Sequence, residues 1–134
     1  KDLDQLMSVL KKNNIKNVKL PVSAPFHCKL MVKATEIMKK EIEKVEFKDA
    51  KIKLISNVTA NEILNKEELK KLLIKQIESR VRWRESIINM INKNINHFIE
   101  IGPGKVLSGL IKRINRGVKI DTVNDYDDIK DLKI

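Results

Sequence analysis

The sequence has 134 residues, enough for one domain with a hydrophobic core and short for two independent domains. Its composition is globular, 42% hydrophobic and 34% charged, with a formal net charge of +10. No stretch approaches the roughly 20 apolar residues of a membrane span, no signal peptide opens the chain, and one cysteine excludes an internal disulfide. We therefore expect a reducing cytoplasm as its location. The first residues look like the middle of a helix, so we expect a piece of a longer protein.

The positive charge does not by itself indicate a nucleic-acid-binding protein. Lysines occur in every segment and alternate with glutamates, as in KKEIEKVEFKDAK, a pattern typical of solvated helix faces. Aromatic residues make up only 4% of the chain, too few for stacking platforms that bind single strands. A basic surface suits phosphorylated cofactors or an acidic carrier protein equally well. We expect no nucleic-acid partner and no membrane partner.

The apolar spacing in the first half of the chain predicts two helices and two strands. Apolar residues three, four and seven positions apart predict a helix over 2–12, and a longer stripe of the same kind predicts a helix over 28–45. The alternating segment VKLPV predicts a strand over 18–22, with Pro21 at its exit. A second strand is expected over 51–58.

The second half continues the alternation. The predicted elements are a helix over 65–79 capped by Asn65, a helix over 84–93, a strand over 97–101, a helix carrying Val106 to Ile114, a strand over 118–123 and a short helical tail. Strands that alternate with helices indicate an α/β protein with parallel strands.

His27 is the first candidate functional residue. It lies between a predicted strand and a predicted helix, and functional groups of α/β proteins collect at the carboxyl ends of strands. It is either a base or a structural histidine that caps the helix, and its position alone favours neither. Cys28 follows directly, but adjacent residues of a helix diverge by about 100°, so a cysteine–histidine pair is not expected.

Four other features have two readings each. Asn57 and Gln76 are polar where a strand end and an apolar helix face are expected, so each is either a buried group bonded to backbone or part of a cleft. The GPGK segment (102–105) lacks the Walker pattern, so a tight turn is favoured over an anion-binding nest. A structural role is favoured for His97. The sequence shows no paired-carboxylate or metal-ligand pattern.

Four segments together resemble the C-terminal part of malonyl-CoA:acyl carrier protein transacylases: LPVSAPFHCKLM, LISNVTAN, KQIESRVRWRESI and FIEIGPGKVLSGLIKRI. The resemblance runs from about residue 15 to residue 116, and it is strongest to the cytoplasmic enzymes of bacterial type II fatty-acid synthesis. It implies an α/β-hydrolase-like acyltransferase domain with an inserted ferredoxin-like subdomain. Residues 1–22 would be the last helix and strand of that subdomain, and residues 23–134 the C-terminal part of the large domain.

The resemblance also implies a reaction. A serine attacks malonyl-CoA, and the malonyl group then passes to the phosphopantetheine thiol of acyl carrier protein. His27, in the family's PxHxxLM motif, would be the general base and then the general acid, and the backbone carbonyl of Gln76 would orient its ring. Asn57 would line the substrate site, and Lys16 would help to attract the phosphates of CoA or the acidic carrier.

The departures from the family pattern are equally informative. The family's serine elbow, the arginine that binds the malonyl carboxylate and the oxyanion loop are not found in this sequence. We therefore expect the isolated chain to be inactive and the full-length enzyme to be a monomer, with malonyl-CoA as substrate, no bound cofactor and no metal. One alternative is a fragment of an acyltransferase domain from a larger polyketide or fatty-acid synthase. The other is a non-enzymatic basic binding module.

Overall fold

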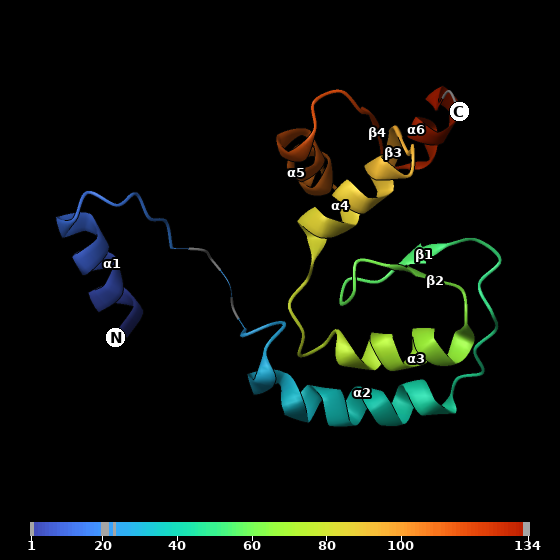
Figure 1. Ribbon diagram of the computed structural model, residues 1–134, viewed down its shortest axis with the longest axis horizontal. Helices are drawn as coiled ribbons and strands as arrows, with labels where there is room; N and C mark the ends of the chain where they lie inside the picture. The colour runs from blue at the N-terminus through green and yellow to red at the C-terminus, as the bar shows by residue number, and fades with distance from the viewer. Residues whose placement is uncertain (1, 20–21, 23, 133–134) are drawn as a thin grey trace.

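The computed structural model describes residues 2–19, 22 and 24–132 (Figure 1). Helices and strands alternate along much of the chain, which confirms the α/β class. The elements are α1 (Asp2–Lys12), the 3-10 helix η1 (Lys29–Met31), α2 (Val32–Lys44), β1 (Leu54–Ile55), β2 (Glu62–Ile63), α3 (Lys66–Lys75), α4 (Trp83–Asn92), β3 (His97–Ile101), α5 (Val106–Ile114), β4 (Lys119–Val123) and α6 (Tyr126–Asp131).

The strands form two separate two-stranded sheets. β3 and β4 are parallel, paired from His97 opposite Lys119 to Ile101 opposite Val123, and α5 connects them. The prediction of parallel strands is wrong for β1 and β2, which are antiparallel. The reason is the tight turn between them, which is too short for the crossover that parallel strands require. In that turn Ala60 donates its N–H to the Ser56 carbonyl at 2.8 Å.

Helices cover both sheets. α3 lies between the β1–β2 hairpin and α2, and α4 and α5 lie beside β3 and β4 (Figure 1). The buried core of the second group consists of Ile87 from α4, Ile111 from α5 and Val118 just before β4, surrounded by partly buried apolar side chains such as Trp83 and Phe98. The core therefore joins the β3–α5–β4 unit to the helix that precedes it.

The ends of several elements differ from the predictions. The strand expected over 51–58 contracts to Leu54–Ile55, because the chain turns back at Ser56. In the strand expected over 18–22, residues 18, 19 and 22 are not in a strand, and residues 20–21 lie outside the described part. The helix expected over 65–79 ends at Lys75, but its predicted cap is confirmed: the Asn65 side chain accepts the N–H groups of Glu67 and Glu68.

α1 stands apart from the rest of the molecule (Figure 1). Its apolar side chains Leu3, Leu6 and Val9 are 51%, 53% and 54% exposed. The predicted amphipathic helix therefore forms, with these three side chains about half exposed and with Met7 and Leu10 partly buried.

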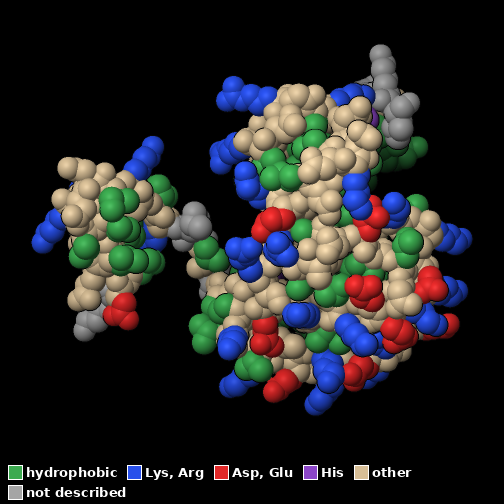
Figure 2. Space-filling view, viewed as in Figure 1, with side chains coloured by type: hydrophobic (Ala, Val, Ile, Leu, Met, Phe, Trp, Pro, Cys, Tyr) green, Lys and Arg blue, Asp and Glu red, His purple; other side chains and the backbone are tan. Residues whose placement is uncertain are grey.

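Charged side chains of both signs are interleaved over the part of the surface formed by α2 and α3 (Figure 2). On α2, Lys39 pairs with Glu43 at 3.8 Å, and Lys44 pairs with Glu41 at 2.7 Å. These are the one-turn ion pairs of a solvated helix face. On α2, lysines are thus paired locally with carboxylates.

Candidate functional site

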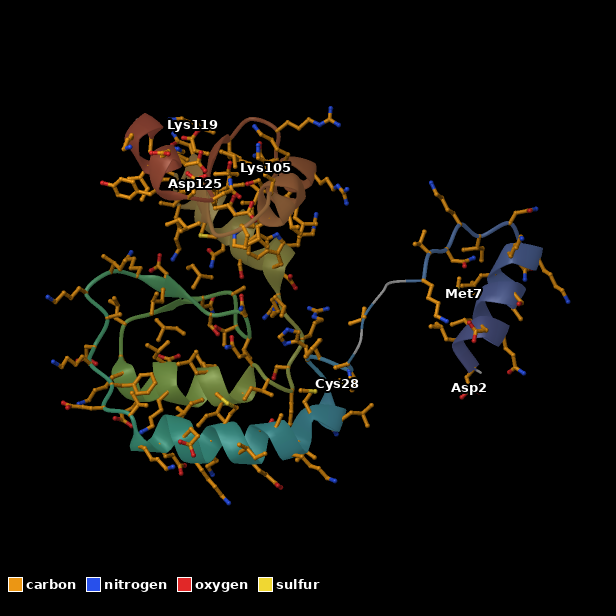
Figure 3. The ribbon with its side chains drawn as sticks, turned by 180° about the vertical axis from the view of Figure 1, so that it is seen from behind. Asp2, Met7, Cys28, Lys105, Lys119 and Asp125 are labelled. Carbon is orange, nitrogen blue, oxygen red and sulfur yellow. The ribbon has the colours of Figure 1, made fainter. Side chains whose placement is uncertain are left out.

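His27 lies just before η1, with an exposed side chain and a backbone φ of +60°. A left-handed backbone is uncommon for residues other than glycine, although histidine is among the types that tolerate it best. Such conformations cluster at functional sites because the surrounding structure must hold them in place. Figure 3 labels the neighbouring Cys28, which lies beside the connection between α3 and α4.

The imidazole of His27 is held by a backbone carbonyl. Its Nδ1 lies 3.0 Å from the oxygen of Gln76, 49 residues further along the chain. A carbonyl oxygen can only accept a hydrogen bond, so Nδ1 carries the proton and donates it. In the neutral ring the lone pair is therefore on Nε2, the nitrogen that is left to act as a base.

The Gln76 carbonyl is available because α3 ends just before it. The following backbone bonds span three residues, from Ile77 to Ile74, from Glu78 to Lys75 and from Ser79 to Gln76, each at 3.3 Å. The last carbonyls of a helix have no partner further along the helix, and an oxygen has two lone pairs. One lone pair of Gln76 accepts the Ser79 N–H and the other accepts His27. The helix end also carries a partial negative charge, which stabilises a positively charged ring.

Asn57 completes the cluster. Its side-chain Nδ2 donates to the side-chain Oε1 of Gln76 at 3.4 Å, and its backbone carbonyl accepts the N–H of Arg82 at 2.8 Å. Asn57 and Gln76 also line a cavity of about 200 Å³. The other lining residues are Ser56 and six apolar ones: Leu54, Ile55, Ile63, Leu69, Leu72 and Leu73. The structure thus brings His27, Asn57 and Gln76 together.

Lys16 is not part of this cluster. Its side chain is exposed, in the segment that follows α1, which Figure 1 draws away from α2 and α3.

Arg82 and Glu85 support the site and were not singled out from the sequence. The Arg82 N–H holds the Asn57 carbonyl, while the Glu85 carboxylate accepts Arg82 at 3.3 Å and Arg80 at 2.9 Å. A hydrogen bond from its own backbone N–H, and then the two arginines, hold the pKa of Glu85 below its usual 4.5. The three-residue spacing of Arg82 and Glu85 at a helix start is the signal that indicates this pair.

The GPGK segment is a tight turn whose two glycine N–H groups are engaged within the chain. Gly102 donates to the Val123 carbonyl at 2.9 Å, and Gly104 donates to the Asn124 side chain at 2.7 Å. At the start of α5 the Glu100 carboxylate accepts the N–H groups of Leu107 and Ser108. The protein's own carboxylate therefore occupies the position that an anion would take.

His97 is paired across the parallel strands. Its Nε2 lies 2.6 Å from Asp121 Oδ2, and Lys119 lies 3.2 Å from the same oxygen. The hydrogen bond from His97, and then that from Lys119, lower the pKa of Asp121. This arrangement favours the structural reading of His97.

Neither a metal-binding cluster nor a membrane-spanning helix is found among the described residues. They contain no group of three or more histidine, cysteine, aspartate or glutamate side chains placed to hold a metal ion. The described helices are all too short or too polar to cross a membrane.

Comparisons with known proteins point to one family. No family model matches the chain. The malonyl CoA-acyl carrier protein transacylase of Bacillus subtilis (strain 168) is 42% identical over 131 residues, which are 97% of this chain and 41% of that protein. The crystal structure of an acyl carrier protein S-malonyltransferase from Vibrio cholerae has a TM-score of 0.83 and 36% identity, with 94% of this chain and 42% of that one covered.

A third similar structure is a type II polyketide synthase acyl carrier protein in complex with its malonyl-transacylase. Its TM-score is 0.83 at 29% identity, with 96% of this chain and 42% of that one covered. The chain spans about two fifths of the length of the relatives that it matches. The resemblance predicted from the four sequence segments is confirmed: over nearly its whole length, this chain is related in sequence and in fold to part of the malonyl CoA-acyl carrier protein transacylases.

Proposed function

We propose that this chain provides the proton-transfer part of an acyltransferase that moves a malonyl group from CoA to the phosphopantetheine thiol of acyl carrier protein, in fatty-acid synthesis. The observation that carries the proposal is the contact of 3.0 Å between His27 Nδ1 and the Gln76 carbonyl. This contact leaves Nε2 of His27 available as a base. The relatives that share this fold are named as malonyl transferases or transacylases.

His27 acts twice in each half-reaction. Nε2 takes the proton of the attacking serine hydroxyl, and the resulting imidazolium gives that proton to the departing CoA thiolate. In the second half the ring takes the proton of the carrier thiol and returns it to the serine. The Gln76 carbonyl and the negative end of α3 stabilise the imidazolium each time, in place of a carboxylate.

The finer assignments form part of the same proposal. Residues 1–22 belong to a ferredoxin-like subdomain, and residues 23–134 to the C-terminal part of an α/β-hydrolase-like domain. Asn57 lines the substrate site, and Lys16 attracts CoA or the carrier. The full-length enzyme is a cytoplasmic monomer that binds malonyl-CoA as substrate without a cofactor.

A second candidate differs only in the carrier. One similar structure is a complex with a carrier of a polyketide synthase, so the malonyl group has two possible destinations. Parallel assays with a fatty-acid carrier and a polyketide carrier distinguish them. Faster transfer to the fatty-acid carrier supports the first candidate.

A chimera tests the proposal. In the Bacillus subtilis transacylase, the region that matches this chain is replaced by this chain, and malonyl transfer from malonyl-CoA to acyl carrier protein is measured. We expect transfer, and we expect His27→Ala to slow both half-reactions by about 10²–10⁴-fold without weakening malonyl-CoA binding. His97→Gln is the control and keeps its activity.

The isolated chain should form no malonyl-serine when it is incubated with malonyl-CoA. A malonylated serine on this chain, or a His27→Ala chimera that transfers at the unchanged rate, would contradict the assignment of His27.

A further inference from the structure

The structure assigns a further role to the side chains of Asn57 and Gln76. We infer that their hydrogen bond, here called the amide latch, holds the Gln76 peptide in the orientation that fixes the proton of His27 on Nδ1. Both are then positioning residues, because they act through the Gln76 carbonyl. The significance of the latch for acyl transfer rests on the proposed function, whereas its effect on the ring does not.

The Gln76 peptide needs a support because it lies where α3 loses regular hydrogen bonding. The bond from Gln76 N to Leu72 O is 3.0 Å, but the next three bonds are 3.3 Å and span three residues instead of four. Bonds of this 3-10 type have poorer geometry, and helix ends fray. The main chain alone therefore holds the carbonyl weakly.

Asn57 is a firm anchor by comparison. The preceding Ser56 is buried, and its N–H donates to the Asn61 carbonyl at 3.0 Å while its hydroxyl accepts the Val58 N–H at 3.1 Å. On the other side, the Asn57 carbonyl accepts the Arg82 N–H at 2.8 Å. The side chain of Asn57 thus projects from a turn that is held on both sides.

The amide latch lies at the edge of an apolar cavity. Gln76 continues the stripe of Leu69, Leu72 and Leu73 along one wall of the cavity of about 200 Å³. Gln76 is partly buried against this apolar wall, so its amide oxygen has less access to water than a fully exposed one and needs a partner. The exposed Asn57 supplies that partner through Nδ2, which lies 3.4 Å from Gln76 Oε1, a long hydrogen bond.

The latch determines which nitrogen of the neutral His27 ring carries the proton. With the latch closed, the Gln76 oxygen lies 3.0 Å from His27 Nδ1 and keeps the proton there. With the latch open, the peptide is free to rotate, and the ring then populates the other tautomer, in which Nε2 carries the proton and is not a base. Asn57 therefore affects the His27 ring without touching it.

Nuclear magnetic resonance on this chain, labelled with ¹⁵N at histidine and asparagine, tests the inference. Two-bond ¹H–¹⁵N spectra at a pH where the ring is neutral should show the Nδ1–H tautomer as the major form of His27. In Asn57→Ala and in Gln76→Leu, the ratio of Nδ1–H to Nε2–H should fall by about threefold or more, as expected for the loss of one hydrogen bond. Gln76→Leu leaves the backbone carbonyl in place, so an unchanged ratio in that variant would overturn the inference.

Asn61 supplies the matched control because it lies in the same turn and its hydrogen bonds there are made by its backbone. Asn61→Ala should leave the ratio unchanged. A second measurement needs no variant: the side-chain amide protons of Asn57 should exchange with water more slowly than those of Asn61. Equal exchange rates would also refute the latch, even if the variants failed to fold.

The chimera separates this inference from the proposed function. There Asn57→Ala should lower kcat about tenfold, whatever its effect on the KM for malonyl-CoA, because the loss of the latch acts on the base. An unchanged kcat would overturn the latch, and a raised KM beside it would leave Asn57 as a substrate contact alone. If the chimera is inactive while the tautomer shift is observed, the proposed function fails and the latch stands.

Discussion

His27 presents its ring from a left-handed backbone, with φ at +60°. This conformation costs an ordinary residue about 1–2 kcal/mol, because its Cβ comes too close to the following carbonyl oxygen. The cost is offset locally by the bond to Gln76. The geometry of the proposed base is thus set by the main chain of residue 27 together with the main chain of residue 76.

Substitutions at His27 should distinguish the effect of the backbone conformation on stability from the effect of the imidazole ring. Asparagine tolerates a left-handed backbone and valine does not, while both remove the imidazole. We expect His27→Val to lower the free energy of unfolding by about 1–2 kcal/mol relative to His27→Asn, measured by urea denaturation. Equal stability of the two variants would show that position 27 does not impose the conformation.

The residues of the site differ in how well the sequence reveals them. His27 stands out because it lies next to a predicted helix start, but its pairing with a carbonyl 49 residues away came only from the family resemblance. The bond between Asn57 and Gln76 follows from no spacing rule, because a turn and a helix end from different elements meet there. Gln76 was noticeable only as a polar residue on an apolar stripe.

At the scale of elements, a carboxylate from the preceding strand, that of Glu100, binds the free N–H groups at the start of α5. Glu100 accepts the Leu107 N–H at 3.0 Å, the Ser108 N–H at 2.7 Å and the Ser108 hydroxyl at 2.6 Å. These bonds, first that from the Ser108 hydroxyl, lower the pKa of Glu100 below its usual 4.5. The strand end and the helix start are thereby joined through one side chain.

The link between Glu100 and α5 should make the free energy of unfolding depend on pH in the acid range. Because the folded pKa of Glu100 is lowered, its contribution is fully present above pH 4.5 and is lost as the pH falls through the folded value. Glu100→Gln should therefore lower the urea midpoint at pH 7. In this variant the midpoint should also fall less steeply as the pH drops below 4.5. Glu36→Gln, at an exposed position of α2, is the control. An unchanged acid profile in Glu100→Gln would show that the link does not stabilise α5.

Elements with long apolar patterns were predictable and short ones were not. The strand at His97–Ile101 has the predicted bounds, because Phe98, Ile99 and Ile101 have strong β-propensity and a glycine turn follows directly. β2 was not predicted, since a strand of two residues, Glu62–Ile63, is too short to show alternation. It exists because Leu54 pairs with Ile63 across the turn, which a local pattern does not show.

At the scale of the whole molecule, packing is uneven. Ile87 is 1% exposed at the centre of the core shared by α4, α5 and β4, whereas Leu3, Leu6 and Val9 of α1 are about half exposed. The stability of this chain therefore resides in the part that follows α1.

Two changes should show how much α1 and the core around Ile87 each contribute to the free energy of unfolding. Ile87→Ala should reduce the free energy of unfolding by about 2–5 kcal/mol, because it leaves a cavity in the core. Deletion of residues 1–12 should change it by less than about 0.5 kcal/mol, because α1 contributes few contacts to that core. Comparable losses in urea denaturation would mean that α1 packs on the rest of the chain.

The partner of His27 is a main-chain atom, and this affects how the site responds to mutation. Any amino acid at position 76 brings the same oxygen, so a substitution there changes the orientation of the acceptor through the latch and the packing but does not remove the acceptor. What matters for the acceptor is the length of α3: one inserted residue would turn the helix end by about 100° and carry the oxygen away from the ring. At the end of α3, insertions and deletions should therefore be more harmful than substitutions of Gln76.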